Sequence, residues 1–246
     1  MKHETLGLVR RQLEEWGYRV SGEQLELIDE YSRLLAGYRK ANVVGTRDPN
    51  EILREHILDS LGCLLFSPLS QARHLADVGS GGGLPGIPLK ILLPGARVVL
   101  IEATGKKAKF LEQVVQELGL NGVEVINARV EEVARDPRRR EAQDVAVARA
   151  VAALPTLVEY CVPLVRVGGH MVAMKGRLMD EEMRQGEAAA KLLGAEVEEV
   201  LAVRRLPEVG EEKQRALVIL TKERESPERY PRKTGIPAKR PLPKGR

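Results

Sequence analysis

The sequence predicts a doubly wound α/β domain that is preceded by a helical extension. From about residue 67 onwards, short apolar runs alternate with segments of helical periodicity. Because parallel strands need a crossover of about a dozen residues, this alternation is typical of a mostly parallel sheet with helices on both faces. The 246 residues are 43% hydrophobic, which is enough for one sizeable core.

The first 66 residues are predicted to form helices separated by short breaks, because apolar residues recur there at helical spacing. Ser21 fits the N-cap of one helix, with Gln24 three places on as its capping-box partner. Asp48 fits the cap of a further helix that has Pro49 at its first position. We therefore expect residues 1–66 to form a helical N-terminal extension packed on the main domain.

Five apolar runs after this extension are predicted to be strands, with helices between them. The strands are expected at residues 74–79, 97–103, 123–129, 144–150 and 169–175, and the helices at 85–93, 105–119, 130–135, 154–166 and 179–193. Two further strands, within 196–206 and 215–223, are separated by too few residues for a crossover helix and should pair antiparallel. A mostly parallel, seven-stranded sheet that ends in an antiparallel hairpin is the Rossmann-like layout of class I S-adenosylmethionine (SAM) dependent methyltransferases. This domain is expected to span residues 67–226.

The composition excludes several classes of protein. Cys63 and Cys161 both fall in apolar, helical segments, so neither a disulfide framework nor a zinc site is expected. The N-terminus is too acidic for a secretory signal peptide, and no apolar run approaches the roughly eighteen residues of a membrane span. We expect a cytoplasmic protein with no metal and no membrane partner.

The last 20 residues carry an uneven share of the charge. Residues 227–246 contain seven Lys or Arg and a single acid, Glu228. This basic, proline-rich tail is expected not to form a helix and to lie extended, either as a solvated tail or as an electrostatic arm for nucleic acid. The candidate RNA contacts are Arg229, Arg232, Lys233, Lys239 and Arg240.

The stretch DVGSGGGLPGIPLKI, residues 77–91, raises the question of which ligand a glycine loop of this kind holds. It fails as a dinucleotide fingerprint because Leu84 stands at the sixth position, and Pro85 delays the helix whose N-terminus would bind a pyrophosphate. Glycines at alternate positions let the backbone take positive φ and pass close to a bulky cofactor. Asp77 could bind the ammonium group of an amino acid moiety, which SAM has. The candidate cofactor residues in this loop are Asp77, Gly79, Ser80, Gly81, Gly83 and Leu84.

A second acid supports a nucleoside cofactor. Glu102 ends the second predicted strand, at a distance from the glycine loop where a carboxylate can accept hydrogen bonds from both ribose hydroxyls. Because SAM and NAD share the ribose, Glu102 does not choose between them. Val130 and Glu131 follow the third strand at the same edge of the sheet and could frame the adenine.

Two arginines and one histidine-acid pair are further candidates. Arg129 and Arg149 end the third and fourth strands, where each could contact an anionic target or form an ordinary surface ion pair. His56 and Asp59 lie one turn apart on one helix face, as a packing pair or as groups near the cofactor.

The sequence lacks the signatures of two kinds of base methylation. It has no Asn- or Asp-Pro-Pro-aromatic tetrapeptide for adenine amines, and neither cysteine follows a proline, as the covalent route to C5 of pyrimidines would favour. Guanine N7 carries a free lone pair, so its methylation needs positioning more than a general base. Aromatic residues make up only 3% of the chain, so any RNA contact should depend on Arg and Lys.

Four segments together resemble one family, the glucose-inhibited division protein B family of 16S ribosomal RNA (rRNA) guanine-N7 methyltransferases. They span residues 42–61, 77–91, 144–154 and 230–242. The resemblance implies that SAM is the cofactor and that its contacts are Gly79, Leu84, Glu102, Ala103, Thr104, Val130, Glu131 and Arg149. It further implies methylation of guanine 527 near the decoding region, with 16S rRNA or the 30S subunit as partner. A monomer is expected, and the basic tail becomes an RNA arm.

Three alternatives remain open from the residues alone. The same fold could methylate another RNA position or a protein, since a fold does not fix a function. The chain could also be a SAM- or nucleotide-binding regulator without catalysis. An NAD-dependent oxidoreductase is disfavoured by Leu84 and by the lack of a His, Tyr or Lys arrangement suited to hydride chemistry.

Overall fold

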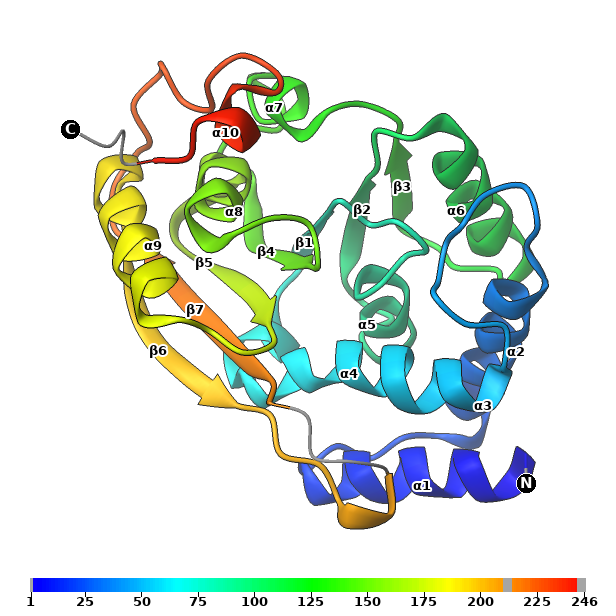
Figure 1. Ribbon diagram of the computed structural model, residues 1–246. Helices are drawn as coiled ribbons and strands as arrows, with labels where there is room; N and C mark the ends of the chain where they lie inside the picture. The colour runs from blue at the N-terminus through cyan, green and yellow to red at the C-terminus, as the bar shows by residue number, and fades with distance from the viewer. Residues whose placement is uncertain (1, 210–213, 243–246) are drawn as a thin grey trace.

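The computed structural model of the chain describes residues 2–209 and 214–242, and it is built around one seven-stranded sheet (Figure 1). The strand order is β3-β2-β1-β4-β5-β7-β6, and every neighbouring pair is parallel except those that β7 makes with β5 and β6. The strands are β1 (His74–Val78), β2 (Arg97–Ile101), β3 (Val123–Ile126), β4 (Gln143–Arg149), β5 (Val165–Lys175), β6 (Ala195–Ala202) and β7 (Ala216–Lys222). The predicted fold class is confirmed, including the antiparallel hairpin at the end of the sheet.

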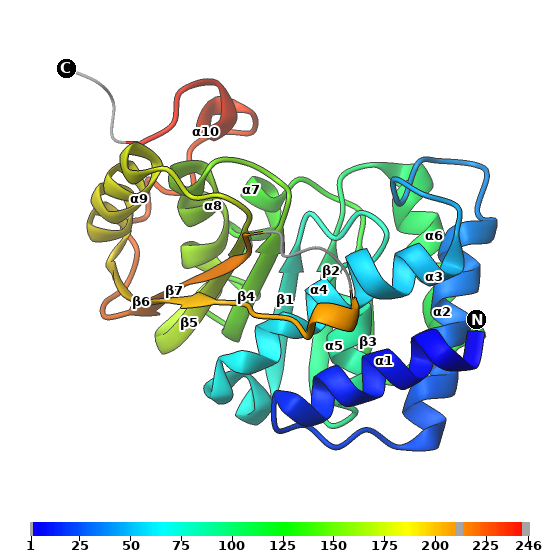
Figure 2. The same ribbon diagram turned by 60° about the horizontal axis from the view of Figure 1, so that its bottom comes forward.

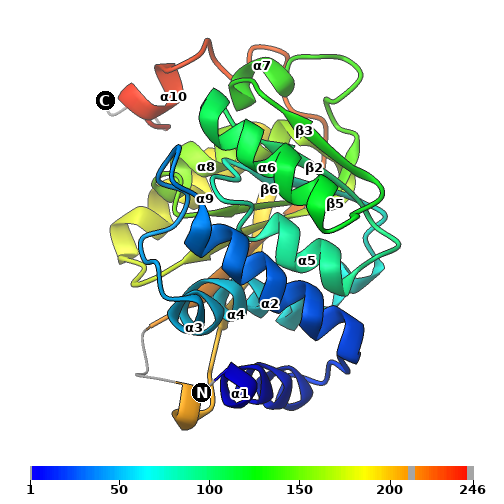
Figure 3. The same ribbon diagram turned by 90° about the vertical axis from the view of Figure 1, so that its right-hand side faces the viewer.

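Helices cover both faces of the sheet (Figures 2 and 3). They are α1 (Lys2–Glu15), α2 (Gly22–Gly37), α3 (Pro49–Glu51), α4 (Leu58–Leu61), α5 (Gly86–Leu92), α6 (Gly105–Glu117), α7 (Val130–Val133), α8 (Leu154–Cys161), α9 (Asp180–Leu193) and α10 (Ile236–Lys239). The N-terminal helices share one core with α5, α6 and one face of the sheet. Helices α7, α8 and α9 share a second core with the other face. Within the described residues, no helix combines the length and the apolar character needed to cross a membrane.

The N-terminal extension has the predicted helices and caps. The Ser21 side chain accepts from the Gln24 amide, and the Gln24 side chain accepts from the Ser21 amide, which completes the capping box. Asp48 accepts from the amide of Asn50, and Pro49 begins α3. A π-helix, Ile52–Ile57, joins α3 to α4, and such wide turns are often found at functional sites.

Several boundaries differ from the prediction, most clearly at the end of α8 and the start of β5. The helix expected at 154–166 ends at Cys161 and passes into a short 3₁₀ turn, Val162–Leu164, because Pro163 cannot continue an α-helix. Strand β5 then begins at Val165, four residues before the predicted start, and its pairing with β4 shifts register between Gln143 and Val145.

The tail needs the largest correction. Its residues 227–242 do not extend freely, and its last four residues lie outside the part of the chain that the structure describes. Tyr230 and Leu242 are buried in the second core, and four tail residues form the short helix α10. The prediction relied on the charge of the segment and overlooked the few apolar side chains that pack it against the protein.

Candidate cofactor site

A cavity of about 350 Å³ opens at the carboxyl edge of the sheet. The strand order reverses between β1 and β4, and ligands of open α/β sheets bind at such a switch point. The cavity is lined by residues that follow four strands: Gly79 and Gly81 after β1, Glu102, Ala103 and Thr104 after β2, Arg129, Val130 and Glu131 after β3, and Ala150, Val151 and Ala152 after β4. Most of the predicted cofactor residues therefore surround one space.

The glycine loop depends on its glycines. Gly79, Gly81 and Gly83 have φ values of 72°, 58° and 95°, in the left-handed region that side chains disfavour. A Cβ atom at Gly79 would lie 2.6 Å from Cγ2 of Val151, another residue of the cavity wall. The loop can therefore approach the β4 loop, and a ligand between them, only without a side chain at this position.

Asp77 supports the loop from behind, and its expected contact with the ammonium group of a cofactor stays a prediction. Its side chain is fully buried, and Oδ2 accepts from the amide of Gly86 at 2.9 Å. Oδ1 has no hydrogen-bond partner among the described residues. Burial raises the pKa of this carboxyl from 3.8 to about 7.

The other loop residues also lie outside the cavity lining. The Ser80 hydroxyl donates to the carbonyl of Asp77, and the Leu84 side chain packs in the first core. Gly83 is held close to Ile87, where an added Cβ would lie 2.5 Å from Cγ1. Ser80, Gly83 and Leu84 thus shape the loop on its protein side.

Glu102 is fixed at the wall of the cavity. Its Oε2 accepts from the amide of Gly81 at 2.9 Å, and its Oε1 accepts from the amide of Thr104 at 2.7 Å. The side chain is only slightly exposed, yet it lines the cavity. Each carboxylate oxygen can accept a second hydrogen bond, so the group stays competent to bind two hydroxyls while its orientation is set in advance.

The far end of the cavity is formed by α7 and its neighbours. Val130 lines it, and Arg129 is exposed at its side. The carboxylate of Glu131 accepts from the amide of Gly235 at 2.8 Å, so this side chain is occupied by the tail. Tyr160 of α8 and Ala238 of α10 complete the lining. Neither residue directly follows a strand of the sheet, so the sequence pattern did not mark them as site residues.

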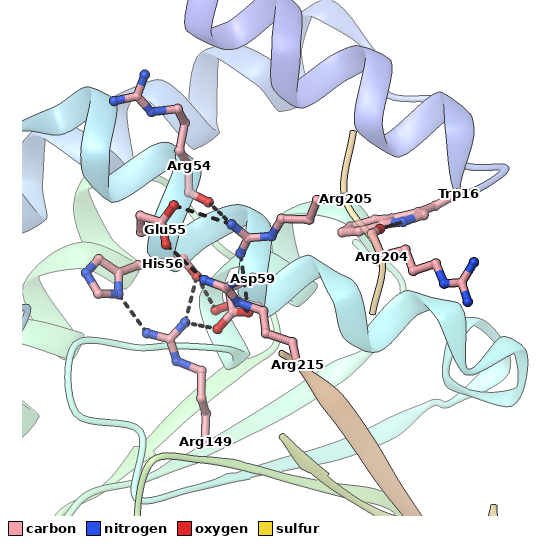
Figure 4. A network of polar contacts seen from close by, with 10 residues as sticks. Trp16, Arg54, Glu55, His56, Asp59, Arg149, Arg204, Arg205 and Arg215 are labelled. Atoms are coloured by element: carbon pink, nitrogen blue, oxygen red, sulfur yellow. Dashed lines mark hydrogen bonds and ion pairs between the residues drawn. The ribbon is translucent and has the colours of Figure 1, made fainter. Parts of the chain in front are cut away.

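Arg149 lines a second cavity of about 470 Å³ and not the first one. It donates through Nη1 to the carbonyl of His56 and to Asp59 Oδ2, both at 2.9 Å, while Nη2 lies 3.0 Å from His56 Nδ1 (Figure 4). Because a guanidinium only donates, Nδ1 of His56 must be the acceptor. Burial, and then the nearby Arg149, lower the pKa of His56, which favours the neutral ring.

Asp59 and a second acid, Glu55, belong to a larger ion-pair network that was not predicted from the sequence. Asp59 forms ion pairs with Arg149, Arg205 and Arg215. Glu55 forms ion pairs with Arg205 and Arg215. Figure 4 shows these groups meeting between the N-terminal helices and the β6–β7 hairpin. No local pattern marks them, because the partners lie 90 to 160 residues apart in the chain.

Ala150 joins the two cavities. It lines both of them, and it has a φ of 55° although it is not a glycine. Such strained backbone is found mostly where the surrounding structure holds a functional site in place. The turn at Ala150 directs Arg149 to the second cavity and Val151 to the first.

Comparison with known proteins identifies the family. The family model described as rRNA small subunit methyltransferase G matches residues 24–212. The chain belongs to this family. Its relatives include ribosomal RNA small subunit methyltransferase G of Rubrobacter xylanophilus, 67% identical over 233 residues, which are 95% of this chain and 89% of that protein. The protein of the same name from Desulfitobacterium hafniense is 42% identical over 97% of both chains.

Solved structures agree on the fold of this methyltransferase. Protein PH1948 of Pyrococcus horikoshii superimposes with a TM-score of 0.55 at 16% identity, over 83% of this chain and all of that one. The antibiotic-resistance methyltransferase Kmr gives a TM-score of 0.51 at 16% identity, over 63% of this chain and 88% of that one. At such identities the likeness shows the class I SAM-dependent methyltransferase fold alone.

Proposed function

We propose that this methyltransferase transfers the methyl group of SAM to N7 of a single guanine in 16S rRNA, guanine 527 near the decoding region. Its substrate is naked 16S rRNA or the 30S subunit, which it meets in the cytoplasm as a monomer. The observation that carries the proposal is the Glu102 carboxylate, which two backbone amides hold at the wall of the cavity beside the glycine loop. The membership of the family of small-subunit rRNA methyltransferases supplies the class of target.

The residues of the cavity fit SAM. The cavity volume of about 350 Å³ lies within the usual range for small-molecule sites, about 300 to 1,000 Å³. Glu102 would accept hydrogen bonds from the ribose hydroxyls, and the Val130 backbone would frame the adenine. The glycines at 79 and 81 leave room for the amino acid part, because a side chain at Gly79 would meet Val151. SAM, when bound, supplies an electrophilic methyl group on a sulfonium.

No general base is needed for this reaction, and the acids of the site are already engaged. Guanine N7 attacks with a lone pair and loses no proton, so the protein mainly has to align N7 with the methyl group. Glu102 accepts hydrogen bonds from two backbone amides, and Glu131 accepts one from the Gly235 amide. Asp77 lies behind the loop. Arg129, exposed at the cavity, is placed to contact a phosphate or base of the incoming RNA.

Labelled SAM tests the proposal. The enzyme is incubated with 30S subunits and, separately, with naked 16S rRNA, and the methylated base is mapped by strand cleavage at N7-methylguanine. We expect one modified guanine, and we expect Glu102→Ala to reduce incorporation at a fixed, limiting SAM concentration. Label in protein, in another base or in neither substrate would contradict the proposal.

A further inference from the structure

The C-terminal segment, residues 226–242, is tied to the body of the enzyme by main-chain contacts along its first half. Arg140 donates through Nη2 to the carbonyl of Ser226 and through Nη1 to that of Tyr230, at 2.7 and 2.8 Å. Arg135 donates to the carbonyl of Pro231 at 2.8 Å. Two cations of the main domain therefore hold the backbone of a segment that is itself rich in cations.

A buried ion pair fixes the middle of the segment. Glu159 of α8 is fully buried, and both of its oxygens accept from the Arg232 guanidinium at 2.6 to 3.0 Å. The Arg232 amide donates to the same carboxylate at 2.7 Å. Nη2 of Arg232 also donates to the carbonyl of Arg240 at 2.7 Å, which closes the loop that contains α10.

This loop reaches the cofactor cavity. The Gly235 amide donates to Glu131, and the Thr156 hydroxyl donates to the carbonyl of Pro237. Ala238 lines the cavity together with Glu131 and Tyr160. In Figure 1 helix α10 lies beside α7 and α8, the helices that carry Glu131 and Tyr160.

We propose that the C-terminal segment is a wall of the cofactor pocket, with Ala238 in contact with the adenine side of bound SAM. This inference rests on the proposed function, because it takes the cavity to be the SAM site. It adds a cofactor-binding element beyond residue 212, where the match to the family model ends.

The same short element presents cations to the solvent. Lys233, Lys239 and Arg240 are exposed, while their neighbour Ala238 lines the cavity. An RNA phosphate bound by these side chains would therefore hold the wall in place. If the free energies of the two binding events are coupled in this way, SAM must raise the affinity for RNA by the same factor as RNA raises the affinity for SAM.

A thiol placed on the wall tests the proposal without disturbing the fold. Cys63 and Cys161 are both fully buried, so Ala238→Cys supplies the one accessible thiol among the described residues. Lys239→Cys, at the next position, which is also exposed but outside the cavity lining, is the matched control. The alkylation rate of each variant is measured with and without saturating S-adenosylhomocysteine (SAH), the product left after methyl transfer, and calorimetry measures SAH binding to both variants and to the wild type.

The outcomes separate this inference from the proposed function. We expect SAH to slow alkylation of Ala238→Cys at least tenfold and to change the rate of Lys239→Cys less than twofold. If SAH binds but does not protect the thiol of Ala238→Cys, the C-terminal segment is not a wall of the pocket, and the proposed function still stands. Absence of SAH binding by the wild type overturns the proposed function, and the inference with it.

Discussion

Replacing Arg232 by alanine should destabilise the enzyme, although the sequence alone places this residue in a solvent-exposed basic tail. The substitution leaves the fully buried carboxylate of Glu159 with only one of its donors, the amide of residue 232. Removing one partner of a buried ion pair costs about 3 to 5 kcal/mol. Because that amide remains and the Arg232 side chain is 15% exposed, we expect the lower end, about 3 kcal/mol. The melting temperature should fall by roughly 6 to 12 °C for a chain of this size.

Urea unfolding of four variants measures this effect. Lys233→Ala, an exposed neighbour, is the control and should change the free energy of unfolding by less than about 0.5 kcal/mol. In a Glu159→Gln background Arg232→Ala leaves no unpaired buried carboxylate, so it should cost about 2 kcal/mol less than in the wild type. If Arg232→Ala alone lowers the free energy of unfolding by less than about 1 kcal/mol, the ion pair does not hold the segment, and the segment is a free arm.

Three further predictions concern the site and its electrostatics. Glu102→Ala should weaken SAH binding by about 1 to 3 kcal/mol in calorimetry, and an unchanged affinity would remove Glu102 from the site. The raised pKa of Asp77, about 7 in the folded protein against 3.8, means that the folded state keeps a proton that the unfolded state loses. The free energy of unfolding should therefore fall as pH rises from 4 to 7 by up to about 1.4 kcal/mol per pH unit from this group, and Asp77→Asn should remove that slope; equal slopes in both proteins would argue against it. The double variant Lys233→Ala/Lys239→Ala should lower the slope of log K for RNA against log salt by about 1 to 2, and an unchanged slope would exclude these lysines as phosphate contacts.

Much of the fold follows from local patterns. The alternation of strands and helices is visible because each element buries one face of its own, and the capping pair Ser21 and Gln24 is a local signal. The positive φ at Gly79 and Gly81 follows from the spacing of glycines in the loop. Prediction was poorer where a proline ended a helix early, as Pro163 does before β5.

The site was predicted less completely, because the direction of a side chain depends on packing far along the chain. One oxygen of the Asp77 carboxyl group accepts from the Gly86 amide, a contact that no local sequence pattern marks. The tail was taken for an extended arm, since seven cations outweigh two large apolar side chains, Tyr230 and Leu242. One signal was present in the sequence: Glu159 stands in a mostly apolar helix, and a buried carboxylate needs a cation from elsewhere.

The most direct test of the cofactor site is a crystal structure of the enzyme with SAH. We predict that the ribose hydroxyls lie within hydrogen-bond distance of the Glu102 carboxylate and that the adenine lies between the Val130 backbone and Ala238. SAH bound instead in the cavity of His56 and Arg149, or bound without contact to Glu102, would contradict the assignment of the cofactor site.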